Sequence, residues 1–315
     1  MTRDPKYLVT GGAGFIGSNI AEALLARGEK VVVLDDLSTG YEKNIAHLSG
    51  DLTFVRGDIR DAAAVRSALA GVDYVLHEAA LASVPRSIED PVLVTDVNVR
   101  GTLVMLEEAR RAGVKRFVYA ASSSAYGDTE ALPKTERMTP KPLSPYAASK
   151  LTGEYYCAVY AHVYGLSTVS LRYFNIFGPR QDPKSQYAAV IPIFVTHILA
   201  GTAPTIFGDG EQSRDFTYIE NVVEANILAS RCEAARGQTV NVACGTRYTL
   251  NELFDAIRGI VGGTVTPKYD APRPGDVKHS HADISVAGSL IGYAVTVPFE
   301  EGLRRTIRWY RGAPA

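Results

Sequence analysis

A glycine-rich turn between a short apolar strand and a helix constrains the fold of this chain more than any other feature. The run Val9-Thr10-Gly11-Gly12-Ala13-Gly14-Phe15-Ile16-Gly17 fits both Gly-x-Gly-x-x-Gly and Gly-x-x-Gly-x-x-Gly. Glycine permits the tight turn out of the strand, close approach of a pyrophosphate, and close packing of helix on strand. The helix that starts near Phe15 then directs its N–H groups at the phosphates. The turn therefore predicts a strand–helix unit that binds a dinucleotide.

Short apolar runs alternate with longer helical patterns up to about residue 175. The apolar runs are rich in valine and leucine on both faces, as strands buried in a parallel sheet are. They cover residues 7–10, 31–34, 52–55, 74–76, 117–121 and 168–171, and the helical stretches cover 15–27, 62–69, 90–112 and 145–164. This alternation predicts an α/β fold with a doubly wound (Rossmann) parallel sheet and helices on both faces.

The character of the chain changes beyond residue 175, where prolines, glycines and tyrosines become frequent. Helical stretches remain at 188–199, 219–231 and 249–261. We expect an NAD-binding Rossmann domain over residues 1–175 and a smaller C-terminal α/β substrate-binding lobe over residues 176–315. The boundary is expected to be discontinuous, because a short strand near 240–243 can return to the main sheet.

Composition narrows the functional classes. The 33 basic and 34 acidic residues give a net charge of -1 without a basic stripe, so we expect no nucleic-acid partner and no membrane-surface partner. The three cysteines, Cys157, Cys232 and Cys244, lack metal-ligand spacing and are expected to be reduced thiols, with no metal site. The chain shows neither a signal-peptide pattern nor an apolar run long enough to span a bilayer, so a soluble cytoplasmic protein is expected.

Acidic and small residues at later strand ends complete the expected cofactor site. Asp35 ends the second strand, where an acid accepts hydrogen bonds from the adenosine ribose and repels a 2′-phosphate, so NAD is favoured over NADP. Asp58 could contact the adenine edge, although a strand-end or helix-capping role explains it equally well. Ala79 and Ala80 let a cofactor lie close, although packing alone could explain them. The expected cofactor-binding residues are Gly11, Gly14, Phe15, Ile16, Gly17, Asp35, Asp58, Ile59, Ala79 and Ala80.

A tyrosine and a lysine stand four residues apart in Tyr146-Ala147-Ala148-Ser149-Lys150. On a helix these positions share a face, so phenol and ammonium are presented together. A tyrosine pKa near ~10 makes a poor base at neutral pH, and a neighbouring ammonium and the positive ring of NAD⁺ would lower that pKa. Lys150 can also hold the nicotinamide ribose. A chance Tyr-x-x-x-Lys would be an exposed helix pair.

A serine run, Ser122-Ser123-Ser124, ends the strand that precedes this helix. Ligands of open α/β sheets bind at the carboxyl ends of the strands. A serine there can hydrogen-bond a reacting oxygen without carrying charge. The serine run and the Tyr–Lys pair together predict proton transfer at a sugar hydroxyl. His77, in contrast, is expected to be a structural histidine.

These motifs, with Arg172-Tyr173-Phe174-Asn175, together resemble the extended short-chain dehydrogenase/reductase family. Within it, the chain is similar to the UDP-hexose 4-epimerases and most of all to the UDP-N-acetylhexosamine 4-epimerases. The resemblance runs over essentially the whole chain and is closest at residues 140–150, 172–192 and 273–283.

The resemblance implies a role for each matching position. Tyr146 would be the base, Lys150 its partner and Ser122 the hydroxyl that shares the C4 oxygen. Tyr146, Lys150 and Tyr173 would also contact NAD. The implied substrate-binding residues are Ser83, Ser123, Ser124, Asn175, Arg214, Arg273, Asp276 and Ser280.

Within that set, Asn175, Arg214 and Arg273 would hold the UDP diphosphate, which suits the fork of an arginine, and Asp276 the uridine ribose. A surface ion pair with Asp215 is the other interpretation of Arg214.

The resemblance also implies which reaction follows C4 oxidation. Nucleotide-sugar 4,6-dehydratases carry an Asp-Glu pair where this chain has Ser123-Ser124, and neutral hydroxyls cannot replace a carboxylate acid and base. We therefore expect C4 epimerisation of UDP-GlcNAc and UDP-GalNAc, extending to UDP-glucose and UDP-galactose. Ser280 stands where hexose-only epimerases carry a bulky tyrosine, which leaves room for an acetamido group, although it could be an ordinary loop residue. Ala82 departs from the lysine common in hexose-specific relatives, and Ser83 could replace part of its contact.

Other functions stay open at this point. A UDP-glucuronate 4-epimerase or decarboxylase would need a cation for the C6 carboxylate, and the sequence identifies none. A non-catalytic NAD-sensing protein of the same fold is possible, although the intact Tyr146–Lys150 pair argues against it. The apolar excess on helices 90–112 and 145–164 predicts a homodimer.

Overall fold

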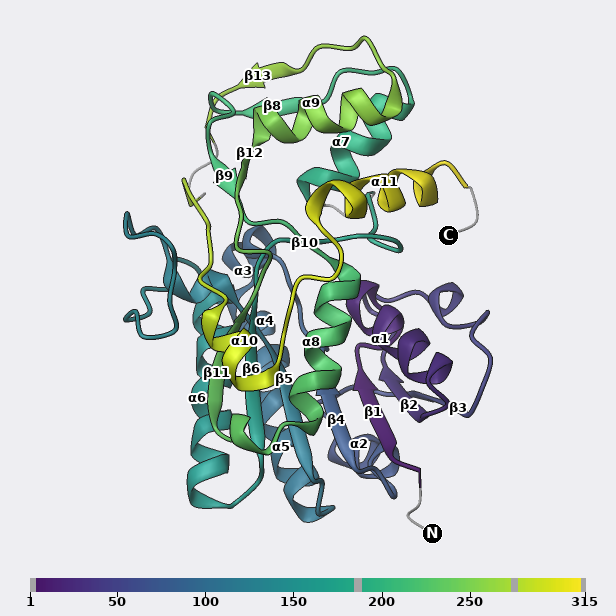
Figure 1. Cartoon of the computed structure of the whole chain (residues 1–315). Coiled ribbons are helices and arrows are strands. Elements are labelled where there is room, and N and C mark those ends of the chain that lie inside the picture. The colour runs from purple at the N-terminus through teal and green to yellow at the C-terminus, as the bar shows by residue number, and fades with distance from the viewer. Residues whose placement is uncertain (1–3, 184–188, 273–276, 313–315) are drawn as a thin grey trace.

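A seven-stranded parallel sheet forms the centre of the computed structural model, which describes residues 4–183, 189–272 and 277–312 (Figure 1). The strands are β1 (Lys6–Thr10), β2 (Lys30–Asp35), β3 (Leu52–Arg56), β4 (Tyr74–His77), β5 (Arg116–Ser122), β6 (Thr168–Tyr173) and β11 (Gln238–Val242). Their order is β11-β6-β5-β4-β1-β2-β3, and each neighbouring pair runs parallel. The order reverses beside β1, which places β1 and β4 at the centre and opens a crevice at their carboxyl ends.

Helices cover both faces of the sheet, because successive side chains of each buried strand point to opposite sides. On β1, Tyr7 and Val9 enter one core while Leu8 enters the other. The first core is covered by α1 (Phe15–Ala26), α8 (Ile219–Arg231) and α10 (Ser285–Ile291), and the second by α2 (Ala62–Ala68), α5 (Thr102–Arg111) and α6 (Pro145–Val163). The predicted doubly wound α/β fold is confirmed.

The helix predicted over residues 90–112 contains a π-helical turn. Its parts are α4 (Pro91–Thr95), the π-helical η2 (Asp96–Gly101) and α5. In the π turn, Asn98 accepts a hydrogen bond from the Leu81 N–H at 2.8 Å and donates to the Ser149 hydroxyl at 3.0 Å. The wider turn therefore ties the loop after β4 to α6, which is a typical use of a π-bulge beside a functional site.

The described part of the second half of the chain adds short strands and several helices. Its elements before β11 are β7 (Ile176–Phe177), α7 (Val190–Leu199), β8 (Thr205–Phe207), β9 (Ser213–Arg214), β10 (Thr217–Tyr218), α8 and the 3₁₀ turn η4 (Glu233–Ala235). After β11 come β12 (Tyr248–Thr249), α9 (Leu250–Val261), β13 (Lys268–Asp270), α10 and α11 (Phe299–Tyr310). The pairs β7–β10, β9–β12 and β8–β13 form small two-stranded sheets. Figure 1 places β8, β13, α7 and α9 together at one end of the molecule, beyond the central sheet.

Residues from the second half also belong to the main sheet. The strand expected near 240–243 is confirmed as β11, which pairs with β6, and α8 packs on the core of β1. The division at residue 175 into two lobes stays a proposal. Smaller elements in the first half are the 3₁₀ turns η1 (Glu42–Asn44) and η3 (Ser123–Tyr126) and the helix α3 (Val84–Glu89). Among the described residues, every helix is too short or too polar to cross a bilayer.

Candidate functional site

The glycine turn joins β1 to α1 in the way that the sequence predicts. Gly11 has φ +63°, and a Cβ on it would lie 2.9 Å from the backbone of Ala79. A Cβ on Gly17 would lie 2.3 Å from the carbonyl oxygen of Gly11, closer than any real contact. Gly14 is the N-cap of α1 and no side chain caps this helix. The first N–H groups of α1 are therefore available to an anion.

A cavity of about 240 Å³ opens beside this turn, which we call the glycine-turn cavity. Its described lining contains four carboxylates and no lysine or arginine, which disfavours a 2′-phosphate. Every cofactor-binding residue predicted from the first four strands lines it, including Ile59, Ala79 and Ala80. The lining residues are Gly11, Gly14, Phe15, Ile16, Gly17, Leu34, Asp35, Asp36, Ser38, Thr39, Gly57, Asp58, Ile59, Glu78, Ala79, Ala80, Leu81, Ala82 and Val97.

The two acids predicted to meet the adenosine differ in their surroundings. Asp35 accepts hydrogen bonds from the N–H groups of Ala13 (2.9 Å) and Leu37 (2.8 Å), which oppose the rise that burial causes in its pKa. Each of its oxygens keeps a second lone pair for a ribose hydroxyl. Asp58, in contrast, is bound by the Arg60 side chain at 2.5 Å, and this hydrogen bond lowers its pKa. The geometry favours a structural role for Asp58, and its contact with adenine stays a prediction.

A second cavity, the central cavity, lies over the carboxyl ends of β5 and β6 and has a volume of about 490 Å³. It brings together the predicted Ser122, Ser123, Ser124 and Tyr146 with Tyr173, Asn175, Arg214 and Ser280. Because Phe15, Ile16 and Ala82 line both cavities, the central cavity adjoins the glycine-turn cavity. A cofactor in one can therefore meet a substrate in the other.

Two serine side chains of the central cavity, Ser122 and Ser124, are hydrogen-bonded to each other. Ser122 Oγ accepts hydrogen bonds from the Ser124 hydroxyl (2.8 Å) and the Ser124 N–H (3.2 Å), which leaves its own O–H to donate. Burial raises the pKa of Tyr146, and a hydrogen bond with Ser122 opposes that rise. Tyr146 also lies in the first turn of α6, where the helix dipole favours a negative charge. The serine run thus supports a phenolate at Tyr146.

Lys150 lies one turn along α6 and is buried. Its ammonium lies 4.8 Å from the centre of the Tyr119 ring and interacts electrostatically with Glu78. Burial lowers the pKa of Lys150 to about 8, and Glu78 opposes this shift. The expected lowering of the Tyr146 pKa by Lys150 and NAD⁺ stays a prediction. Tertiary contacts draw the ammonium to Tyr119 and Glu78, and helical spacing alone could not reveal these.

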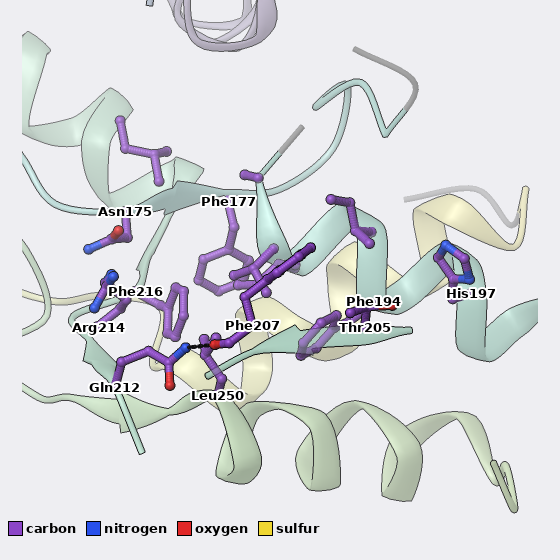
Figure 2. A pocket seen from close by; sticks show the side chains of 15 residues that line it. Asn175, Phe177, Phe194, His197, Thr205, Phe207, Gln212, Arg214, Phe216 and Leu250 are labelled. Atoms are coloured by element: carbon purple, nitrogen blue, oxygen red, sulfur yellow. Dashed lines mark hydrogen bonds between the residues drawn. The ribbon is translucent and has the colours of Figure 1, made fainter. Parts of the chain in front are cut away.

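A third cavity, the aromatic cavity, adjoins the central cavity through Asn175, Ile176, Ala189 and Arg214 and has a volume of about 390 Å³. Figure 2 shows Asn175, Arg214 and Gln212 on one side of it, His197 on the other and phenylalanine rings between. The described lining comprises Asn175, Ile176, Phe177, Ala189, Val190, Ile191, Ile193, Phe194, His197, Thr205, Phe207, Gln212, Arg214, Phe216 and Leu250. Polar groups at the junction and rings beyond it suit a ligand with a charged middle and a flat end.

The polar residues at this junction are held by the backbone around them. Asn175 has φ +34°, an unusual conformation for a non-glycine residue, and its amide donates to the Asp215 carbonyl at 3.2 Å. Arg214 donates to the carbonyls of Ser213 and Lys278, at 3.0 and 3.1 Å. The Asp215 carboxylate accepts three backbone N–H groups, which disfavours the alternative of an Arg214–Asp215 ion pair.

The remaining predicted residues fall into four groups. Ser280 lines the central cavity, with its N–H held by the Ser213 carbonyl at 2.9 Å. Ser83 Oγ instead accepts a hydrogen bond from the Arg86 N–H and caps α3, so its contact with substrate stays a prediction. Arg273 and Asp276 lie outside the described residues. His77 is buried between the hydroxyls of Thr10 (2.7 Å) and Thr102 (3.0 Å), and its structural role is supported.

Sequence reasoning missed two parts of the site. One is the aromatic cavity, whose phenylalanines come from separate short elements and resemble ordinary core residues. The other is Glu78, directly after β4 and in the wall of the glycine-turn cavity. Its Oε2 is buried without a hydrogen-bond partner in the described structure. An orphaned acceptor fits a cavity that a hydroxyl-bearing cofactor fills.

Comparison with known proteins agrees with this geometry. The model of the NAD dependent epimerase/dehydratase family matches residues 7–243. A UDP-glucose 4-epimerase from Mycolicibacterium smegmatis is 41% identical over 97% of this chain and 98% of its own length. Two solved structures match this chain over nearly its whole length and nearly the whole of their own.

The first is a UDP-N-acetylglucosamine 4-epimerase from Methanobrevibacter ruminantium in complex with UDP-N-acetylmuramic acid. It has a TM-score of 0.94 and 41% identity, and the match covers 99% of each chain. The second is a UDP-glucose 4-epimerase from Thermus thermophilus in complex with NAD. It has a TM-score of 0.89 and 40% identity, and the match covers 98% of this chain and 100% of the other. The chain therefore belongs to the NAD dependent epimerase/dehydratase family, with NAD as its cofactor.

Proposed function

We propose that this chain is a UDP-sugar 4-epimerase that interconverts UDP-GlcNAc with UDP-GalNAc and also UDP-glucose with UDP-galactose. The observation that carries the proposal is the chemistry of the central cavity. Its described lining offers the hydroxyls of Ser122, Ser123, Ser124 and Tyr146 but no carboxylate. A 4,6-dehydratase would need a carboxylate acid and base at the position of Ser123 and Ser124, so a 4-keto sugar formed here would be reduced again and not dehydrated.

The residues of the central cavity suit proton transfer at C4. Ser122 would hold the C4 oxygen, and the Tyr146 phenolate would take its proton and later return it. NAD, when bound, supplies the oxidation and re-reduction of C4. The cavity volume of about 490 Å³ leaves room for the keto sugar to turn between the two steps, so that the opposite face is reduced.

The aromatic cavity supports a uridine diphosphate as the handle. Its rings offer stacking surfaces for a flat base. Gln212 donates to the Phe207 carbonyl at 2.5 Å, while its Oε1 is buried without a partner in the described structure and could accept an N–H from a base. Arg214 and Asn175 lie at the junction with the central cavity, where they would bind the diphosphate. A base, a diphosphate and a sugar would thus fill the two adjoining cavities in order.

The wall at Ser280 supports acceptance of N-acetylated sugars. Ser280 and the serine run line the same cavity, and a serine leaves space that a tyrosine ring would fill. A 2-acetamido group could occupy this space. UDP-glucose and UDP-galactose, which lack that group, would fit as well.

A uronate substrate is less well supported. Lys134 is the lysine of the central cavity lining, but its ammonium donates to the carbonyl and hydroxyl of Thr129, and burial lowers its pKa. A C6 carboxylate would have to compete for this cation. Neutral hexoses are therefore the better substrates for this cavity.

We also propose that two copies of the chain pair through α6 and the neighbouring α4. Tyr155, Val159 and Val163 lie four residues apart on α6 and are 58%, 45% and 60% exposed, and Val92 of α4 is 78% exposed. Such a stripe suits a self-complementary interface across a two-fold axis. We expect Val159→Asp to convert a dimer to a monomer in light scattering, while Tyr269→Asp, on exposed β13, leaves the mass unchanged. A parent protein that is already a monomer contradicts the proposal.

Incubation of the purified protein with UDP-GlcNAc tests the function. We expect UDP-GalNAc to accumulate, and UDP-galactose to form from UDP-glucose, as resolved by chromatography or proton NMR. Accumulation of a 4-keto-6-deoxy sugar would indicate a dehydratase instead. No product from any of the four UDP-sugars, with NAD bound, would indicate a non-catalytic NAD-binding protein.

A further inference from the structure

Glu78 is a buried carboxyl group that the proposed chemistry does not yet use. It follows β4 in the wall of the glycine-turn cavity. Its Oε1 accepts a hydrogen bond from the Tyr173 hydroxyl at 2.8 Å, and the Tyr173 oxygen in turn accepts one from the Asn226 amide at 2.7 Å. Glu78 is thus held in place from β6 and α8, while its Oε2 has no hydrogen-bond partner in the described structure.

This arrangement also defines the part that Tyr173 plays. A phenol has one proton to donate, and Tyr173 gives it to Glu78. One of its acceptor sites is filled by Asn226. Tyr173, predicted to contact NAD, therefore also fixes the orientation of Glu78 in the wall of the cofactor cavity.

Burial raises the pKa of Glu78 to about 7, and the charged group that opposes this rise is the Lys150 ammonium. Lys150 is buried, and its ammonium lies over the neutral ring of Tyr119 at 4.8 Å. A cation removed from water in this way needs a counter-ion. Two carboxylates act on it, Glu78 and Glu154.

Glu154 is already neutralised by a second cation. Both of its oxygens accept hydrogen bonds from Arg172, at 2.7 to 3.2 Å, and both side chains are buried. The other titratable neighbours carry no charge at neutral pH. His77 has a pKa lowered to about 3 by burial, and Cys157 has a pKa raised to about 12 by burial. Among the described neighbours of Lys150, Glu78 is therefore the carboxylate without another cationic partner.

We propose that Glu78 is a positioning residue of the epimerase, which acts as the counter-ion of Lys150 and keeps its ammonium charged beside the cofactor. The inference rests on the proposed function, because it assigns a role to a residue of the same site. Tyr173 holds one carboxyl oxygen, and the other is buried without a hydrogen-bond partner in the described structure, in the wall of the cavity where the cofactor would bind. Lys150 in turn can hold the nicotinamide ribose, so the charge of Glu78 bears on cofactor binding as well as on the reaction.

The effect of removing the Glu78 charge follows from the two opposing influences on the pKa of Lys150. Burial lowers the pKa of Lys150, and the Glu78 carboxylate raises it towards about 8. Without that carboxylate, Lys150 would lose its proton at a lower pH. Activity and NAD binding, if they need the Lys150 ammonium, would therefore be lost at a lower pH. Removal of one opposite charge should shift this alkaline limb by about one pH unit.

Glu78→Gln tests this inference, because an amide of the same shape can still accept from Tyr173. The first measurement is the pH dependence of kcat/KM for UDP-GlcNAc between pH 6 and 10. We expect the alkaline limb of Glu78→Gln to lie about one pH unit below that of the parent protein. Asp255→Asn removes a surface carboxylate of α9 that pairs with Arg258, away from the described cavity linings, and should leave the alkaline limb in place. An unshifted limb in Glu78→Gln overturns the inference.

The second measurement does not depend on turnover. NAD binding to cofactor-stripped protein, followed by calorimetry across the same pH range, should weaken above the pH at which Lys150 loses its proton. This break should also occur about one pH unit lower in Glu78→Gln. If NAD binding shows this pH shift but the protein epimerises no UDP-sugar, the proposed function is wrong and the role of Glu78 stands. Active protein with identical breaks in parent and variant would sink the role of Glu78 alone.

Tyr173→Phe provides the test if Glu78→Gln does not fold. It removes the hydrogen bond that stabilises the ionised Glu78, so the same limb should move in the same direction, by a smaller amount. An unchanged limb in folded Tyr173→Phe contradicts the inference.

Discussion

The ion pair between Glu154 of α6 and Arg172 of β6 holds the helix of the Tyr–Lys pair against the sheet. Its side chains are 3% and 5% exposed, and the shortest N–O distance is 2.7 Å. The Arg172 guanidinium also lies 4.6 Å from the centre of the Tyr126 ring, in the 3₁₀ turn that follows Ser122. Glu154→Gln would leave a buried arginine without its counter-charge, which typically costs about 3–5 kcal/mol.

The change should be visible in thermal unfolding. At about 2.1 cal/mol/K per residue, a chain of 315 residues has an unfolding entropy of roughly 0.7 kcal/mol/K. A loss of ~4 kcal/mol therefore lowers Tm by about 6 °C in differential scanning calorimetry. Asp255→Asn is the matched control, because Asp255 pairs with Arg258 on the surface of α9 with a 63% exposed side chain. It should shift Tm by less than about 1.5 °C. Equal shifts in the two variants would refute the argument that burial makes the Glu154–Arg172 pair costly to break.

Two further outcomes test the substrate wall and the buried histidine. Ser280→Tyr should fill the space proposed for the acetamido group. We expect kcat/KM for UDP-GlcNAc to fall at least tenfold, while kcat/KM for UDP-glucose is largely kept. Equal losses for both sugars would place the acetamido group elsewhere. Burial lowers the pKa of His77 to about 3 in the folded protein, against about 6.5 in the unfolded chain. The neutral imidazole therefore makes its full contribution to stability above pH 6.5, and this contribution is lost as the pH falls towards 3. Between pH 7 and pH 5 the parent should therefore lose about 2 kcal/mol more than His77→Gln in urea unfolding, and parallel pH profiles would contradict a buried neutral imidazole.

Features encoded by local spacing could be predicted from the sequence. The glycine turn and its helix are contiguous in the chain, so the requirements at Gly11 and Gly17 follow from residue type alone. The serine run and Tyr146 were expected to meet because parallel strands and their helices present carboxyl ends at one edge. The alternation of apolar runs and helical patterns likewise predicted a doubly wound parallel sheet, although the order of its strands comes from the structure. The π turn around Asn98 was missed, because its cause is a tertiary contact with the loop after β4.

The interactions that depend on distant segments could not be predicted. The aromatic cavity draws Phe177, Phe194 and Phe207 from three separate elements, and none has a neighbour in sequence that marks it as a ligand contact. Helical spacing placed Lys150 on the face of Tyr146, but its ammonium lies against Tyr119 on β5 and interacts electrostatically with Glu78. Burial and long-range charge, which have no sequence pattern, decide these positions.

The most direct test compares Tyr146→Phe with the parent protein in the interconversion of UDP-GlcNAc and UDP-GalNAc. The phenylalanine ring preserves packing and removes only the group that takes the C4 proton. With NAD bound to both proteins, the account predicts a loss of about 10²–10⁴-fold in kcat. A Tyr146→Phe protein that epimerises as fast as the parent would contradict it.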